Sequence, residues 1–263
     1  MLNKIPDKPS EVCRICHSSS VFHGEVTILK KHRASYFRCI ECGFIQTEEP
    51  YWLEEAYSAA IAGQDVGIMG RNLHNSEVVS AILELLFSDT KDAIDFGAGH
   101  GILVRMMRDR GFNFFWFDRY AANDYARGFE AQQGRKFDFL TAFEVLEHFT
   151  DPISEISKLM ELSGNVLVST VLVPTPVPKV DEWWYFMPRS GQHISFYTEE
   201  SLRLLARRFK RHLLSFNSYH LFSTEPKNRI LFELASRPRC AKLLNHFFRR
   251  PSLVTSDLTT MIQ

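Results

Sequence analysis

Short apolar runs alternate with helical segments through the middle of the chain. Four runs, at residues 93–96, 114–117, 137–143 and 166–173, have the length and the Phe, Val, Leu and Ile content of buried strands. An amphipathic run from about residue 75 to residue 86 precedes them and predicts a helix. Strands that alternate with helices are typical of a parallel, doubly wound sheet, so we predict an α/β fold.

The C-terminal third begins with a loop marked by Pro174, Pro176 and Pro178. An aromatic stretch follows at residues 183–186. Beyond it, the spacing of apolar residues predicts a helix over about 198–209 and two strands, near 212–222 and 229–236.

The composition is that of a globular protein with a buried core, because 45% of the 263 residues are hydrophobic and 24% are charged. No apolar run approaches the roughly 18 residues that span a bilayer, and the first residues lack the apolar stretch of a secretory signal. We therefore expect a cytoplasmic protein. Basic and acidic residues number 31 each, so the net charge does not indicate a nucleic-acid partner.

Four of the five cysteines lie in the first 42 residues, as the pairs Cys13/Cys16 and Cys39/Cys42. In a reducing compartment two CxxC pairs favour a metal site over disulfides. Four thiolates form a closed tetrahedral site without an open position, so we predict a structural zinc ion in a small ribbon. The alternative is four unrelated buried cysteines. Too few apolar residues lie in this region for a core of its own, so something else must hold it together.

A glycine-rich turn directly follows the first predicted strand, with Gly97, Gly99 and Gly101 leading into a helix. Such a turn lets the backbone approach a ligand closely. A dinucleotide fingerprint needs a glycine at the sixth position from Gly97, where this chain has Ile102, so that pattern fails. Asp118 ends the next strand, 21 residues after Gly97, where a carboxylate can accept ribose hydroxyls. Its alternative role is that of an ordinary loop acid.

The pattern D-x-G-x-G-x-G followed by this acid resembles class I S-adenosylmethionine (SAM) methyltransferases. The block at residues 137–148 resembles the fourth-strand motif of the same superfamily, a strand that runs into VLEH. With the cysteine pairs and the HISFYT segment at 193–198, the chain resembles the zinc-ribbon-bearing methyltransferases of sugar and surface-polysaccharide pathways. The resemblance implies a Rossmann-like class I sheet, mostly parallel with its last strand antiparallel.

The resemblance also implies a SAM site. Gly97, Gly99 and Gly101 would line the methionine and ribose parts of SAM, and Asp95 would orient their loop. Asp118 would hold the ribose. Phe143 and Glu144 would lie beside the sulfonium, and Phe129 is a candidate for the adenine wall.

Methyl transfer to a hydroxyl needs a group that accepts the proton, and histidine suits this role because its ordinary pKa lies near neutrality. We rank His193 first, His148 second and Glu147 third. Each histidine can instead have a structural hydrogen-bonding role, and His148 can simply begin the next helix. The aromatic residues at 183–186 either grip a sugar ring or form a lid over the cofactor.

Twelve basic residues lie between Arg203 and Arg250, against the two acids Glu225 and Glu233. Such a segment is usually a solvated face, but it can attract a nucleic acid, an anionic membrane surface or a pyrophosphate-linked sugar. Peripheral membrane contact is therefore compatible with the sequence. The apolar spacing at residues 241–248 is compatible with docking and more typical of a core-packing helix.

We accordingly predict a ribbon at 1–50, a helical connector and cofactor cap at 51–90, a SAM-dependent methyltransferase domain at 91–236 and a basic tail at 237–263. The predicted reaction is O-methylation of a saccharide, a sugar nucleotide or a surface polysaccharide, with a histidine base. The alternatives are an RNA methyltransferase that uses the basic segment, and a sugar C-methyltransferase. A nucleic-acid partner is not expected, and the sequence does not indicate an oligomeric state.

Overall fold

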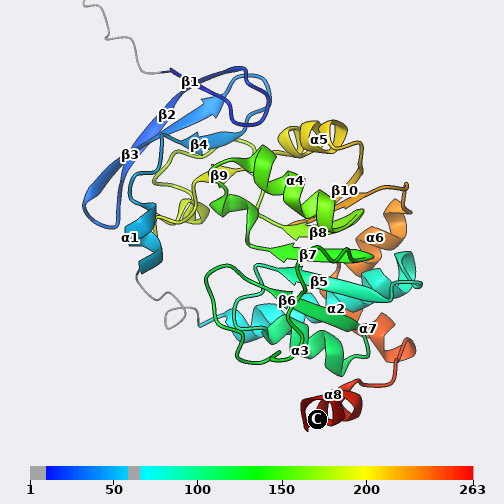
Figure 1. Cartoon of the computed structure of the whole chain (residues 1–263). Coiled ribbons are helices and arrows are strands. Elements are labelled where there is room, and N and C mark those ends of the chain that lie inside the picture. Colours follow the sequence, from blue (N-terminus) through cyan, green and yellow to red (C-terminus); the bar gives the residue numbers. More distant parts are fainter. Residues whose placement is uncertain (1–9, 59–65, 263) are drawn as a thin grey trace, which may run out of the picture. The chain divides into compact units, whose positions relative to one another are not determined.

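The computed structural model describes residues 10–58 and 66–262, and the chain divides into two compact units (Figure 1). Unit 1 comprises Met1–Gln64, Glu144–Ile156 and Thr170–Phe209. Unit 2 comprises Asp65–Phe143, Ser157–Ser169 and Lys210–Gln263. Parts of the predicted ribbon (1–9) and connector (59–65) lie outside the described residues, and the predicted domain boundaries remain predictions.

Unit 2 contains a six-stranded sheet in the order β10-β11-β8-β7-β5-β6 (Figure 1). Strands β6, β5, β7 and β8 are parallel, whereas β11 is antiparallel to both β8 and β10. The prediction of a mostly parallel sheet with its last strand antiparallel is therefore confirmed. The strands are β5 (Asp92–Phe96), β6 (Asn113–Phe117), β7 (Phe139–Phe143), β8 (Asn165–Ser169), β10 (His212–Phe216) and β11 (Tyr219–Ser223).

The helices of unit 2 pack apolar side chains into one core with this sheet. Val78, Ile82 and Leu83 are fully buried in that core, together with Met107 and Phe139. The predicted helix at 75–86 is confirmed, although it begins earlier. The helices are α2 (Ile68–Leu86), α3 (Ile102–Asp109), α6 (Arg229–Ala235), α7 (Pro238–Phe247) and α8 (Val254–Ile262), and α4 (Pro152–Leu162) runs from unit 1 into unit 2.

Two predictions for the C-terminal third are wrong. Residues 229–236 do not form a strand, because Asn228 caps a helix there by accepting a hydrogen bond from the backbone N–H of Leu231. The ion pair Arg229–Glu233 spans one turn of this helix. Residues 212–222 contain two strands instead of one, since Asn217 adopts the left-handed conformation (φ 53°) at the turn of a hairpin.

A buried ion pair holds the C-terminal helix of unit 2. Both Asp257 oxygens accept hydrogen bonds from Arg108, at 2.6 and 2.9 Å, and Arg105 lies 2.8 Å from the same carboxylate. Burial raises the pKa of Asp257, but the bonds from the two arginines outweigh it and lower the pKa. The charged pair therefore links α8 to α3.

Unit 1 is built on a five-stranded antiparallel sheet in the order β1-β2-β3-β4-β9. Its last strand comes from far along the chain and pairs with β4. The predicted helix at 198–209 is confirmed as α5, which Thr198 caps. The elements are β1 (Ser10–Val12), β2 (Ser19–Ile28), β3 (His32–Cys39), β4 (Ile45–Thr47), β9 (Ser195–Phe196), α1 (Leu53–Ser58) and α5 (Glu199–Arg208).

The N-terminal strands share their core with the aromatic segment of residues 183–196. Tyr36 and Trp52 are buried beside Tyr185, Phe186 and Phe196 in one cluster. Later segments of the chain therefore supply much of the core that holds this region together, although the region itself has few apolar residues. Within the described residues, none of the helices has the length and apolar character needed to span a bilayer.

Candidate functional site

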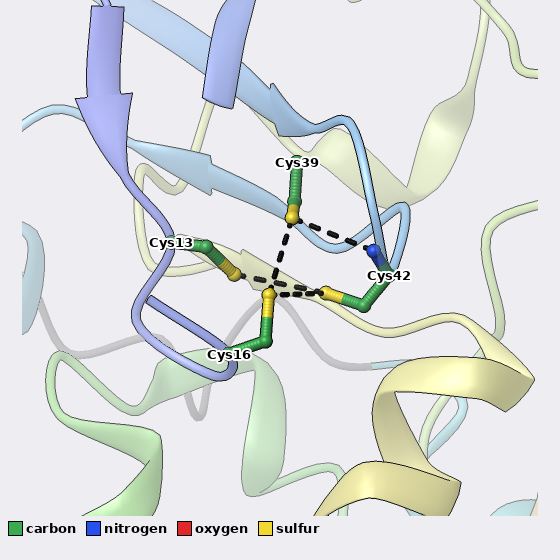
Figure 2. A group of neighbouring side chains, drawn as sticks. All are labelled: Cys13, Cys16, Cys39 and Cys42. Atoms are coloured by element: carbon green, nitrogen blue, oxygen red, sulfur yellow. Dashed lines mark hydrogen bonds between the residues drawn. The ribbon is translucent and has the colours of Figure 1, made fainter. Parts of the chain in front are cut away.

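Four cysteine sulfurs converge in unit 1, two from the turn between β1 and β2 and two from the end of β3 and the turn after it (Figure 2). The Sγ–Sγ distances are 3.7 Å for Cys13–Cys42, 3.4 Å for Cys16–Cys39 and 3.6 Å for Cys16–Cys42. A tetrahedral zinc ion with Zn–S bonds of about 2.3 Å requires sulfurs about 3.8 Å apart. The spacing is therefore compatible with a zinc ion.

The backbone around the sulfurs has the expected knuckle arrangement. The N–H of Ile15 lies 3.4 Å from the sulfur of Cys13, and the N–H of Cys42 lies 3.5 Å from that of Cys39. Gly43, which follows, adopts a φ of 69° that favours glycine. The hydrogen bond from Cys42 lowers the pKa of Cys13 to about 5 and raises the pKa of Cys42.

In unit 2, the glycine-rich turn connects β5 to α3 in left-handed backbone conformations. The φ angles of Gly97, Gly99 and Gly101 are 73°, 52° and 86°. A Cβ atom at Gly99 would meet nothing within 4 Å, whereas one at Gly101 would lie 2.8 Å from Asn123 Oδ1 and 3.1 Å from Ala126. Gly99 therefore faces open space that a ligand can occupy. The missing Cβ of Gly101 instead lets Asn123 and Ala126 pack closely against the turn.

Asp118 follows β6 and holds the turn through backbone amides. Its Oδ2 accepts the N–H of Gly99 at 2.8 Å, and its Oδ1 accepts those of Tyr120 and Ala121 at 2.7 and 2.8 Å. A carboxylate offers about four acceptor positions, so about one remains on Oδ2 for a ribose hydroxyl. The structure thus brings Asp118 and the glycine turn together, as the spacing of the two motifs predicted.

Asp95 is 4% exposed and accepts a 2.6 Å hydrogen bond from the hydroxyl of Thr141 on β7. Burial raises the pKa of Asp95 to about 7, and the charge of Asp118 adds to this effect. A carboxylate with so perturbed a pKa, in the strand that leads into the glycine turn, is a candidate functional group.

The remaining aromatic candidates of unit 2 differ in their surroundings. Phe143 ends β7 and packs edge-on against Tyr219, with ring centroids 5.9 Å apart. Phe129 is buried, and the guanidinium carbon of Arg108 lies 3.6 Å from its ring centroid. Arg108 therefore covers one face of this ring, and the role of Phe129 as an adenine wall stays a prediction.

Sequence reasoning missed Trp116, which supports the glycine turn. Its indole N–H donates a 2.8 Å hydrogen bond to the carbonyl of Gly99. Trp116 stands in a run of aromatic residues on β6, so the sequence offers little that would single it out.

The three predicted catalytic residues do come together, in unit 1. Glu147, His148 and His193 each place one ligand-type atom within 4.8 Å of the others. The hydroxyl of Tyr185 donates a 2.6 Å hydrogen bond to Glu147 Oε1 and lies 3.4 Å from Glu144 Oε2. Tyr185 is thus a further member of this polar cluster, which we define as Glu144, Glu147, His148, Tyr185 and His193.

Burial determines the protonation of the polar cluster. It lowers the pKa of His148 to about 4 and, with the neighbouring His148, lowers that of His193 to about 3. Burial and the charge of Glu144 raise the pKa of Glu147 well above its ordinary value. Both imidazoles are therefore neutral near pH 7 and bind protons weakly.

The aromatic stretch beside the polar cluster divides into core and surface. Trp183 packs against Tyr185 and Phe186, with ring centroids 5.3 and 5.2 Å apart. Trp184 is 69% exposed. Only the second indole offers an open face for a ligand.

The chain matches the family model of a methyltransferase domain over residues 70–210. A comparison with curated protein sequences gives no match. Among solved structures, an O-methyltransferase family protein from Burkholderia thailandensis is 17% identical with a TM-score of 0.50, over 65% of this chain and 63% of that chain. The mitomycin 7-O-methyltransferase MmcR is 14% identical with a TM-score of 0.45, over 64% of this chain and 59% of that one.

A magnesium protoporphyrin IX methyltransferase from Synechocystis, solved with bound SAM, is 15% identical with a TM-score of 0.39, over 62% of this chain and 83% of that chain. The chain thus spans less than two thirds of the first two of these three structures. At 17% identity, the likeness to the first structure shows the fold alone.

Proposed function

Because the chain belongs to the methyltransferase-domain family of SAM-dependent enzymes, we propose that it transfers the methyl group of SAM to an oxygen of a saccharide. The observation that carries the SAM site is the juxtaposition of Gly99 and Asp118. The turn is open on the side where Gly99 lacks a Cβ, and the carboxylate of Asp118 is held against it by the N–H of Gly99.

The residues present fit SAM. When bound, SAM supplies a methyl group on a positively charged sulfur, and alignment with the acceptor provides much of the acceleration. The backbone at Gly97 and Gly99 would receive the methionine and ribose parts, and Asp118 would accept a ribose hydroxyl at its remaining position on Oδ2. When ionised, Asp95 would contribute negative charge near the cationic cofactor.

We also propose that Cys13, Cys16, Cys39 and Cys42 hold a structural zinc ion. The four sulfurs lie within 4.8 Å of one another, with three of the distances at 3.4–3.7 Å, and two of the sulfurs are within reach of backbone N–H groups. All four donors are thiols, so the site leaves no position for a substrate. Its role would be to fix the two turns that flank the β2–β3 hairpin.

The polar cluster of unit 1 contains the residues that the sequence predicts to accept the proton of the acceptor hydroxyl. Direct proton transfer to His193 was the expectation from the sequence, yet its pKa of about 3 makes it a weak acceptor, because a general base works best near the pH of the reaction. His193 alone is therefore a poor general base for a hydroxyl.

Two features support a saccharide as acceptor. The exposed indole of Trp184 offers a flat apolar face of the kind that packs against a pyranose ring. The basic C-terminal segment would suit a pyrophosphate-linked sugar. Several of its arginines form ion pairs, for example Arg203 with Glu199 and Arg250 with Glu84, which leaves fewer cations for a ligand, and a single pyrophosphate needs fewer of them than the many phosphates of an RNA backbone.

The proposal is tested with the purified full-length protein, SAM and three acceptor pools: sugar nucleotides, surface oligosaccharides and bulk RNA. We expect S-adenosylhomocysteine to form only with a saccharide pool, and mass spectrometry to find the methyl group on a sugar oxygen. Gly99→Arg serves as the inactive control. Methyl transfer to RNA, to a sugar carbon or to none of the pools would refute the proposed acceptor.

A further inference from the structure

We propose that Glu147, His148 and His193 bind a divalent transition-metal ion, in addition to the ion at the four cysteines. The three side chains come from two separate segments of unit 1, the 3₁₀ turn Leu146–His148 and the segment just before β9. One ligand atom from each lies within 4.8 Å of the others. Nothing in the proposed SAM site uses these atoms.

The hydrogen bond of His193 leaves its Nε2 available as a ligand. Nδ1 of His193 lies 2.8 Å from the carbonyl oxygen of Tyr185, and Nδ1 of His148 lies 3.1 Å from that of Gln192. A carbonyl oxygen only accepts, so in His193 Nδ1 carries the proton and Nε2 has the free lone pair. His148 also hydrogen-bonds the backbone of Glu144, a bond that it would exchange for the ion if the same nitrogen binds it. Metal-binding histidines usually donate their other ring N–H in this way, which fixes the tautomer and the orientation of the ring.

The carboxylate of Glu147 points to the same ligand. Glu147 is fully buried, and its Oε1 accepts the hydrogen bond of Tyr185. Its Oε2 is buried, and besides Tyr185 this carboxyl interacts with another acid, Glu144. Two acids that share one tyrosine hydroxyl are costly when one of them is buried, and Glu144 lies 3.4 Å from the hydroxyl of Tyr185. A cation would bind Oε2 and stabilise the ionised form of Glu147 beside Glu144.

The donor set indicates the class of ion. Two imidazoles and one carboxylate are the protein ligands of catalytic zinc sites and of non-haem iron sites, in which other positions stay open. Such an ion lowers the pKa of an oxygen ligand. Its use in activating the acceptor hydroxyl rests on the proposed function, whereas metal binding itself does not.

Metal analysis of the full-length protein after zinc loading and dialysis tests the site. We expect about two zinc ions per chain in the wild type and about one in Glu147→Gln and in His193→Ala, because a site of three protein ligands that loses one no longer holds the ion. The zinc that these variants retain at the cysteines reports that unit 1 is still folded. His246→Ala is the matched control, since this histidine is exposed and lies in unit 2.

In a second experiment, the zinc ion at Glu147, His148 and His193 is removed and the protein is titrated with Mn²⁺. Electron paramagnetic resonance follows the signal of free Mn²⁺. Mn²⁺ prefers nitrogen and oxygen ligands over thiolates, so it reports on the new site alone. Tyr185→Phe should weaken Mn²⁺ binding about 10- to 100-fold, because the hydroxyl orients Glu147.

One zinc per chain in the wild type together with no Mn²⁺ binding would overturn the proposal, as would a second zinc that both variants retain. These measurements use neither SAM nor an acceptor. A metal site without methyl transfer to saccharides would therefore refute the proposed function and leave the metal site standing.

Discussion

Replacing Asp95 by asparagine tests the electrostatics of the SAM site. The wild-type carboxylate is buried on β5 with one hydrogen bond, from Thr141. The asparagine side chain would keep that bond through its carbonyl oxygen but would carry no charge. The pKa of Asp95 is raised from 3.8 to about 7, first by burial and then by Asp118.

The sign of the effect follows from the raised pKa. The folded state favours the protonated form of Asp95. The stability that this preference contributes is fully present below the ordinary pKa and is lost as the pH rises to about 7. At 1.36 kcal/mol per pKa unit, the ionised carboxylate costs the folded protein about 4 kcal/mol above pH 7. The amide of the variant has its own cost of about 1–3 kcal/mol, because its NH₂ group is buried.

The measurement is urea unfolding of the wild type and Asp95→Asn at pH 5 and pH 8. The variant should be the more stable protein at pH 8, and the difference between the two free energies of unfolding should change by about 3 kcal/mol across this range. Asp89→Asn, at an exposed acid of the same unit, should show no comparable change. A stability difference that is the same at both pH values would refute the reasoning. The variant should also bind SAM more weakly.

Three further perturbations have defined outcomes. Zinc removal by a chelator, or Cys39→Ser, should lower the melting temperature of unit 1 and release about one ion. Circular dichroism measures the melting and a colorimetric assay the released zinc, and an unchanged melting curve would contradict the structural role. Asp257→Asn should destabilise the attachment of α8 by about 3–5 kcal/mol, since buried Arg108 would keep its hydrogen bonds to Asn113 and to the Phe114 carbonyl but would lose the charge that compensates its own. Hydrogen exchange in α8 should accelerate, and unchanged protection would contradict this prediction. Trp184→Ala should raise KM for the saccharide and leave the affinity for SAM and the free energy of unfolding unchanged, because the ring is exposed. An unchanged KM would show that this residue does not bind the acceptor.

Features that depend on neighbouring residues could be predicted from the sequence. The paired cysteines, the glycine turn and Asp118 are fixed by short spacings, and the structure brings each group together. The parallel strands were predictable for the same reason, since each is a short apolar run between helical segments. The family model confirms the methyltransferase domain that the glycine turn indicated.

Features that depend on distant partners could not be predicted. The apolar run at 229–235 resembles a strand, and the burial of Phe232 in the core of unit 2, among residues from distant segments, favours a helix there instead. The role of Tyr185 follows from its contact with Glu147, which lies 38 positions earlier in the chain. Burial then weakens His193 as a base, and no local pattern reveals that burial.

Calorimetric titration with SAM tests the central claim, that the open turn at Gly99 and the carboxylate of Asp118 form the cofactor site. We predict binding of about one SAM per chain and none to Gly99→Arg, whose side chain would fill the open space. Gly134→Arg is the matched control, because Gly134 also has a positive φ (79°) and open surroundings. Equal SAM binding by all three proteins, or binding of a nicotinamide dinucleotide in place of SAM, would contradict the account.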